Sequence, residues 1–316
     1  MVNIENISDS SIKKACEILL SGGLVAIPTE TVYGLGGDGT NPIAVQAIFT
    51  AKGRPSFNPL ISHVCDINML EQIAIVHDTA RKIIDAFCPG GITLILQRTQ
   101  DCPVAKTACA DLNTIAVRIP AHTQTLALIK SFGRPIVAPS ANKSGHISPT
   151  TAEHVKSSLG EKVDLILDGG QCTAGLESTI IDMSMNAPCL LRAGAIRKEA
   201  IEAILGAPLA EKTFAKGNNP IAPGQLKSHY APDMPLYMNI DTPNPKHAYL
   251  GFGDCAQCDL NLSPNADLKE AGKNLFDYLH KLNNNGVLAI DIAPIPNVGI
   301  GVAINDKLVR ASAKKE

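Results

Sequence analysis

The sequence has no tryptophan, and only 4% of its 316 residues are aromatic. Modules that bind single-stranded RNA usually stack bases on aromatic side chains, so such a module has little support here. An excess of charge of one sign is also lacking, because 28 basic residues oppose 30 acidic residues. Tight binding of nucleic acid through bulk electrostatics is therefore not expected, although a local basic groove is compatible with this charge.

Long apolar runs are absent as well, and no segment is long enough to span a bilayer. The opening MVNIENISDSSIKK has neither the basic region nor the apolar region of a secretory signal. Nine cysteines are scattered without the spacing of a disulfide framework. We therefore expect a cytoplasmic protein with reduced thiols and no membrane association.

One pair of cysteines is closely spaced, Cys255 and Cys258 in GDCAQCD. A lone CxxC can be half of a zinc site or a redox pair. No second CxxC or histidine pair accompanies it, although His247 is close in sequence. We interpret the two residues as incidental loop cysteines.

Common catalytic motifs are missing too: there is no Walker A motif, no HExxH and no GxSxG. The stretch GLGGDG at 34–39 does fit G-x-G-x-x-G, which is typical of dinucleotide-binding turns. Six residues separate it from the preceding apolar run, however, and the RPSFNPL region about 20 residues on holds no acidic ribose ligand. We interpret GLGGDG as a glycine-rich turn rather than a dinucleotide cradle.

The chain is 45% hydrophobic and 18% charged, which favours packed cores, and its length suggests two domains. Short apolar strands and helices alternate over residues 1–207, and TIIDM and CLLRA are joined too briefly for a helical crossover. This pattern predicts an α/β domain with a mixed sheet. Its expected helices cover residues 9–21, 42–52, 79–87, 123–132, 150–159 and 197–205.

Residues 208–235 break the alternation, with five prolines and no periodicity, and we interpret them as a linker or a functional loop. A smaller alternation follows over residues 236–316. Its expected strands are LYMNI, AYLGF and VLAIDI, and its expected helices lie near 266–283 and 301–315. We predict a small C-terminal α/β domain.

Polar side chains gather in loops and at strand ends, where α/β domains place their sites. The hydroxyls of PTETVY either bind a small ligand or form a Ser/Thr turn. Lys52 and Arg54 either bracket a polyphosphate or supply favourable charge at a helix end. Arg118, inside an apolar strand, requires an anionic partner. Further polar candidates are Ser140, Asn142, Ser144, Ser148, Glu177, Ser178 and Arg192.

Together, PTETVYGLGGD, AKGRP, FNPLISHV, PSANKSG, ESTIID and LLRAG resemble the YrdC-type threonylcarbamoyl-adenylate synthase family. The match runs in order over about residues 10–207, and APGQLKSHYAP resembles the linker of the longer, two-domain members. The resemblance implies an open, twisted mixed α/β sheet around a concave cavity, followed by a small Rossmann-like domain. Residues 208–235 would then be a linker that folds over the cavity as a lid.

The family reaction joins L-threonine, bicarbonate or CO2, and ATP into threonylcarbamoyl-AMP, with release of pyrophosphate. The product feeds N6-threonylcarbamoyladenosine (t6A37) formation in tRNA, and other proteins transfer it, so tight tRNA binding is not expected. Mg²⁺ would arrive on the ATP phosphates, because the motifs offer few carboxylates.

The resemblance also assigns site residues. Those for L-threonine are Thr31, His63, Arg118, Ala138 and Ser178. Those for ATP are Lys52, Arg54, Asn58, Thr114, Ser140, Asn142, Ser148, Arg192, His229 and Tyr230, of which Lys52 and Arg54 would be catalytic.

Some features depart from the family pattern, such as Ala222 and Gln225 in the linker. An alternative with the same fold is the carbamoyl-transfer module of hydrogenase maturation proteins. That module accompanies an acylphosphatase-like segment and paired CxxC zinc fingers, and the sequence shows neither.

Overall fold

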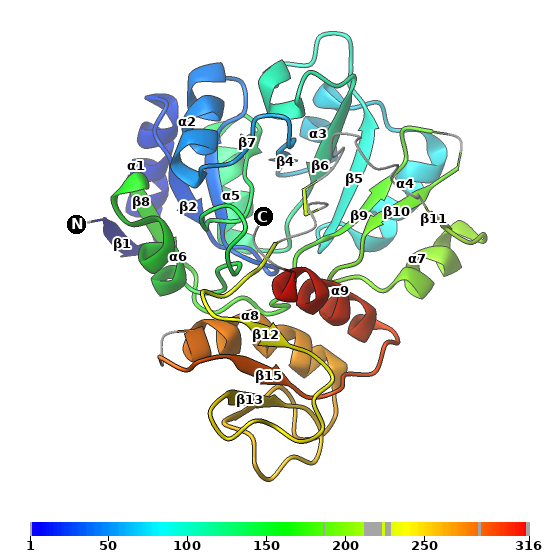
Figure 1. Cartoon of the computed structure of the whole chain (residues 1–316). Coiled ribbons are helices and arrows are strands. Elements are labelled where there is room, and N and C mark those ends of the chain that lie inside the picture. The colour runs from blue at the N-terminus through cyan, green and yellow to red at the C-terminus, as the bar shows by residue number, and fades with distance from the viewer. Residues whose placement is uncertain (1, 186, 212–222, 225–228, 284–285, 314–316) are drawn as a thin grey trace.

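The structure is a computed structural model, and it describes residues 2–185, 187–211, 223–224, 229–283 and 286–313. Eleven strands form a large mixed sheet with five parallel and five antiparallel neighbour pairs (Figure 1). In spatial order the strands are β1 (Asn3–Asn6), β8 (Leu165–Asp168), β2 (Val25–Ile27), β3 (Gly34–Asp38), β7 (Ile136–Val137), β4 (Ile61–His63), β6 (Thr114–Arg118), β5 (Ile92–Gln97), β9 (Thr179–Asp182), β10 (Cys189–Arg192) and β11 (Ala210–Glu211).

Helices connect these strands, and the six that the sequence predicts are all present. Their starts follow capping rules: the Asn41 side chain accepts from the amide of Ile43, and Pro42 takes the first helical position. Helix α3 was not predicted. The helices are α1 (Asp9–Leu20), α2 (Pro42–Lys52), α3 (Ile67–Ile73), α4 (Asp78–Phe87), α5 (Thr123–Phe132), α6 (Ala152–Leu159) and α7 (Lys198–Leu205), with short 3₁₀ turns η1 (Lys106–Cys109) and η2 (Gly160–Lys162).

The prediction of a turn at GLGGDG is wrong, because Gly34–Asp38 forms strand β3, antiparallel to both β2 and β7. Its glycines serve close packing instead of a left-handed turn. A Cβ on Gly34 would lie 3.0 Å from the Cβ of Ala138, and one on Gly37 would lie 3.0 Å from Ile48. Absence of side chains lets β7 and α2 approach the strand closely.

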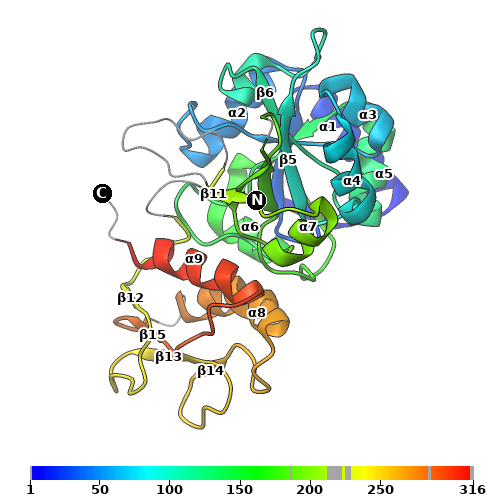
Figure 2. The ribbon, with the colours of Figure 1, turned by 90° about the vertical axis from the view of Figure 1, so that its right-hand side faces the viewer.

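The C-terminal part forms a second, fully parallel sheet in the order β12 (Leu236–Tyr237), β15 (Ile290–Ile292), β13 (Ala248–Gly251) and β14 (Leu260–Asn261). Helices α8 (Leu268–Asn283) and α9 (Ile300–Ser312) lie between this sheet and the large one (Figures 1 and 2). The predicted small α/β unit is therefore present, although the boundaries 1–207, 208–235 and 236–316 stay a prediction. In the part of the chain that the structure describes, no helix is both long and apolar enough to cross a bilayer.

The two units share one hydrophobic cluster. Leu176 and Tyr230 pack with Leu275 and Phe276 of α8. Gly175 lies so close to α8 that a Cβ there would be 2.3 Å from the carbonyl oxygen of Lys273. Helix α8 therefore rests directly on the segment that leads into β9.

Candidate active site

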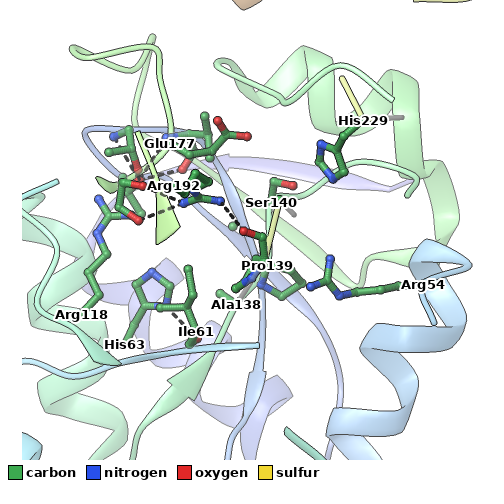
Figure 3. Close-up of a pocket in the computed structure, with 17 residues that line it drawn as sticks. Arg54, Ile61, His63, Arg118, Ala138, Pro139, Ser140, Glu177, Arg192 and His229 are labelled. Carbon is green, nitrogen blue, oxygen red and sulfur yellow. Dashed lines mark hydrogen bonds between the residues drawn. The ribbon is translucent and has the colours of Figure 1, made fainter. Parts of the chain in front are cut away.

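A small enclosed cavity lies beside the ends of β4, β6, β7 and β10 (Figure 3). Its volume is about 40 Å³, room for a few water molecules. The lining residues are Thr29, Thr31, Val32, Gly34, Arg54, Ile61, His63, Arg118, Ala138, Pro139, Ser140, Glu177, Ser178, Arg192, Pro223, Gly224 and His229.

All five residues that the resemblance assigns to threonine line this cavity: Thr31, His63, Arg118, Ala138 and Ser178. Strand pairing explains part of this arrangement. Strands β4 and β6 are parallel and in register, which places His63 opposite Arg118 at their carboxyl ends. Parallel strands deliver their loops and terminal side chains to the same edge of a sheet, so residues distant in sequence meet there.

Arg118 is buried, and the sequence analysis predicted that its charge needs an anionic partner. Its Nη2 lies 2.7 Å from Oε1 of Glu30, and its Nε donates to the carbonyl oxygen of Gly90 at 3.2 Å. The Arg118 side chain is 4% exposed and Glu30 is 13% exposed. The Glu30 carboxylate thus balances the Arg118 guanidinium at the cavity wall.

His63 is neutral in the folded protein. Burial and, second, the nearby positive charge of Arg118 together lower its pKa to about 3. One ring nitrogen, Nδ1, lies 3.2 Å from the carbonyl oxygen of Ile61. The cavity therefore contains a neutral imidazole beside a cation.

This burial predicts a specific acid sensitivity. An unfolded histidine binds a proton near pH 6.5, whereas folded His63 does so only near pH 3. Between these values the unfolded state takes up the proton, so His63 reduces the free energy of unfolding as pH falls, by up to about 1.4 kcal/mol per pH unit. Denaturant unfolding at several pH values should show a shallower slope for His63→Gln. His146→Gln, at a partly exposed ring, is the control, and an unchanged slope in His63→Gln would contradict the assignment.

Three buried cations lie near one another at the cavity: Lys52, Arg54 and Arg192, which are 4%, 7% and 7% exposed. Burial and the charge of Arg192 lower the pKa of Arg54 to about 9, and burial and Arg54 lower the pKa of Lys52. Among the described residues none of the three forms an ion pair with a carboxylate. Buried cations without counterions make this side of the cavity a site for an anion.

Lys52 does not line the cavity. Its ammonium donates to the carbonyl oxygens of Ser140 and Asn142, and the Asn142 amide donates in turn to those of Lys143 and His146. Both side chains therefore hold the loop of residues 140–146 in place. Arg54 does line the cavity, while its Nε and Nη2 donate to the carbonyl oxygens of Asn58 and Pro59.

Besides Lys52, five predicted ATP residues lie outside the lining: Asn58, Thr114, Asn142, Ser148 and Tyr230. Asn58 is fully buried, and neither amide atom has a hydrogen-bond partner among the described residues. Thr114 stands at the start of β6, on the same face as Arg118 but four residues earlier, about 13 Å away. Ser148 donates to Glu177 at 2.8 Å.

His229 lines the cavity and its ring meets that of Tyr230 edge to face, at 4.1 Å between centroids. Burial and the cations Arg54, Lys52 and Arg192 hold the pKa of His229 well below its usual value, so the ring is neutral. Tyr230 has a φ of 64°, and its hydroxyl has no partner among the described residues. Residues 212–222 and 225–228 of the predicted linker lie outside the described residues, so its predicted closure stays untested.

An apolar patch lies on the same part of the large sheet. It contains Ile61, which also lines the cavity, and its other members come from neighbouring strands. The patch consists of Ile61, Ile95, Ala116, Ile180, Cys189 and Leu191. All six side chains are buried, so this cluster is part of the core next to the cavity.

Sequence analysis missed Lys307, which reaches the cavity wall from α9. Its side chain is 1% exposed, and its Nζ donates to the carbonyl oxygen of Ala193 at 2.6 Å. The same Nζ lies 4.0 Å from Oε2 of Glu177, a cavity-lining carboxylate. The C-terminal unit therefore contributes a buried cation beside the site.

We predict that Lys307→Met lowers kcat/KM about tenfold for the pyrophosphate release that the resemblance implies, because the Glu177 carboxylate loses its neighbouring cation. In the Glu177→Gln background the same change should cost much less. Lys281→Met is a matched control, since that lysine pairs with Asp277 on α8 and is 55% exposed. Equal losses in both backgrounds would show that Lys307 does not act through Glu177.

The fold and this buried, cationic cavity define a small-molecule enzyme of the YrdC-like α/β class. The family described as "Telomere recombination" matches residues 17–194, and "Threonylcarbamoyl-AMP synthase, C-terminal domain" matches residues 196–313. The chain is similar to the threonylcarbamoyl-AMP synthases of Bacillus subtilis (38% identity, 96% of this chain and 94% of the relative) and Schizosaccharomyces pombe (33% identity, 96% and 88%).

Among solved structures, Pyrococcus abyssi Sua5 complexed with L-threonine is similar, with a TM-score of 0.89, 34% identity and coverage of 99% of this chain and 97% of that one. The chain belongs to the threonylcarbamoyl-AMP synthase family, in its two-domain form. This membership confirms the resemblance inferred from the motifs and places the protein among nucleotidyltransferase-type enzymes of tRNA modification.

Proposed function

We propose that the protein condenses L-threonine, bicarbonate or CO2, and ATP into threonylcarbamoyl-AMP and pyrophosphate, for transfer by other proteins to adenosine 37 of tRNA. The observation that carries this proposal is the cluster of Lys52, Arg54 and Arg192, buried without carboxylate partners among the described residues. A triphosphate supplies the missing negative charge. The relative's structure with L-threonine supports the amino-acid side of the proposal.

Threonine would bind at Arg118. Its carboxylate can replace Glu30, whose ion pair at 2.7 Å marks a place for an anion. The hydroxyls of Thr31 and Ser178 and the neutral ring of His63 line the same end of the cavity. They offer donors and acceptors to the threonine amine and hydroxyl, and the backbone at Ala138 closes that side.

The chemistry needs orientation and charge neutralisation more than a side-chain nucleophile. The threonine amine attacks the carbon of CO2 and forms an N–C bond, giving an N-carboxylate with release of one proton from the nitrogen. One of its oxygens then attacks the α-phosphorus of ATP, and the bond to pyrophosphate breaks. When bicarbonate supplies the carbon in place of CO2, the carboxylation of the amine releases one water molecule.

The cations would bind the phosphates. Arg54 and Arg192 line the cavity, so we assign them direct contacts, and Lys52 keeps the Ser140 loop in place. We place Asn58, Thr114, Asn142, Ser148, His229 and Tyr230 around the nucleotide, with Thr114 farthest from the threonine end.

Mg²⁺ would enter as part of the ATP substrate. Within the described residues no group of three or more His, Cys, Asp or Glu side chains is arranged to hold a metal ion. Glu177 is the acidic residue of the described cavity wall, and Lys307 lies 4.0 Å from it. The protein thus offers phosphate-binding cations where the metal-bearing triphosphate would lie.

The test is release of pyrophosphate by the full chain in mixtures that each omit one of threonine, bicarbonate and ATP. We expect release only when all three are present, with CO2 excluded by degassing in the bicarbonate-free mixture. Release from ATP alone at the full rate would refute the proposed condensation.

A further inference from the structure

The CxxC pair, which the sequence analysis treats as incidental, is a built feature of the small sheet. Cys255 and Cys258 lie in the loop between β13 and β14, and neither lines the cavity. A Cβ on Gly251 would be 2.7 Å from Sγ of Cys255 and 2.9 Å from Sγ of Cys258. Both sulfurs therefore fill the space that a side chain at position 251 would occupy, and they lie close to each other.

Hydrogen bonds hold the loop in this shape. The Cys258 thiol donates to the carbonyl oxygen of Cys255 at 3.0 Å. The amide of Gly253 donates to Ser263 at 2.8 Å, and the Asn261 side chain donates to Gly253 at 2.9 Å. The proximity of the thiols follows from a loop that is fixed at both ends.

A zinc site does not fit these contacts. Structural zinc takes four ligands, and the described residues supply no group of three or more candidate ligands. His247, the nearby histidine in sequence, is instead 3.0 Å from the Asp291 carboxylate through its Nδ1. Two adjacent thiols without further ligands are arranged for redox chemistry instead.

The two thiols differ in access. Cys255 lines a surface hollow together with Asp241, Tyr249, Phe252 and Asp254, whereas Cys258 does not. Burial, followed by the hydrogen bond with Cys255, raises the pKa of the Cys258 thiol to about 11. Cys255 is therefore placed to react first with a molecule from solvent.

We propose that Cys255 and Cys258 form a redox-active dithiol that closes to a disulfide by exchange with a small uncharged disulfide. The Cys255 thiolate attacks one sulfur of the incoming disulfide, and one thiol leaves. The Cys258 sulfur then attacks Cys255, its proton passes to the second leaving thiol, and an intramolecular disulfide remains. Two electrons and two protons pass to the oxidant, which is released as two thiols.

The charge around the pair sets the preference for an uncharged oxidant. Asp241 and Asp254 line the hollow, and the next residue after Cys258 is Asp259. These carboxylates repel an anionic disulfide such as oxidised glutathione. Such repulsion between exposed charges weakens as salt screens it.

The experiment treats the reduced full-length protein with hydroxyethyl disulfide and follows free thiols and peptide masses. The wild type should lose two of its nine thiols and give a peptide with a Cys255–Cys258 disulfide. Cys258→Ser should stop at a mixed disulfide on Cys255, and Cys255→Ser should react far more slowly. The variant Cys16→Ser with Cys65→Ser, which removes two other partly exposed thiols, should still form the disulfide.

The double variant Cys255→Ser with Cys258→Ser should keep the wild-type activity and melting temperature. That result would show that the loop tolerates the loss of both thiols. Thiol loss at the wild-type rate in this double variant, or adducts in the wild type without a Cys255–Cys258 linkage, would overturn the dithiol. Oxidised glutathione should react several times more slowly than hydroxyethyl disulfide at low salt. Equal rates would overturn the preference for an uncharged oxidant.

Discussion

Arg54→Ala should lower the rate of pyrophosphate release about 10²–10³-fold in a protein that stays folded. Arg54 lines the cavity, and among the described residues it has no carboxylate partner. Its charge is therefore available to neutralise the triphosphate as the α-phosphorus is attacked. Steady-state assays of purified protein, with melting temperatures measured alongside, provide the comparison.

Loss of backbone contacts must be separated from loss of charge, because Arg54 also donates to the carbonyl oxygens of Asn58 and Pro59. Arg98→Ala is a suitable control, since Arg98 donates to the carbonyl oxygen of Val104 at 2.7 Å and does not line the cavity. It should lose stability without a comparable loss of rate. A folded Arg54→Ala protein within roughly twofold of wild type would exclude the role of Arg54.

Arg118→Ala should raise the KM for threonine about 100-fold, which corresponds to a loss of about 2.7 kcal/mol. The side chain is 4% exposed, so its ionic hydrogen bonds to a bound carboxylate would form largely out of water. The KM for ATP should change much less, because the phosphates would bind at Arg54 and Arg192 rather than at Arg118. Threonine binding followed by calorimetry checks the same loss without turnover.

Removal of Arg118 also leaves Glu30 without its ionic partner. The double variant Arg118→Ala with Glu30→Gln should therefore be measured in parallel. Arg134→Ala is the matched control. Arg134 forms an ion pair with Asp38 at 2.9 Å, and neither residue lines the cavity. That variant should bind threonine normally. Unchanged threonine affinity in folded Arg118→Ala would place the substrate carboxylate elsewhere.

Much of the large sheet could be predicted because its central strands are buried on both faces and form short apolar runs such as ITLILQ and VDLILD. The short connection between β9 and β10 correctly indicated that the sheet is mixed, and these two strands form an antiparallel pair. GLGGD misled the prediction, since glycine is depleted in strands. Its strand conformation depends on β7 and α2 packing against it, which no local pattern reveals.

The missed strands β1, β11 and β14 have a different cause. NIEN at Asn3–Asn6 is polar, and β14 has two residues, so neither shows apolar alternation. Strands β1 and β11 stand at the two edges of the large sheet. An edge strand gains its conformation from pairing with one neighbour, and sequence composition constrains it weakly.

The grouping of the five residues that the motifs assign to threonine was predictable, since all five line one cavity, and their role stays a proposal. Lys307 was not, because its importance comes from the docking of α9 on the loop that carries Ala193. The hydrogen bonds from Lys52 to the carbonyl oxygens of Ser140 and Asn142 could not be predicted either. The sequence identifies a cation near a helix end but not the groups that it contacts. Contacts between distant segments are set by tertiary packing.

Mass spectrometry of the nucleotide product after incubation with threonine, ATP and ¹³C-bicarbonate tests the proposed reaction most directly. The expected product is threonylcarbamoyl-AMP that carries the labelled carbon and retains both threonine and AMP. It should be absent from the same mixture with Arg118→Ala protein at threonine concentrations near the wild-type KM. Formation of threonyl-AMP without the labelled carbon, or of ADP in place of an AMP product, would contradict the proposed condensation.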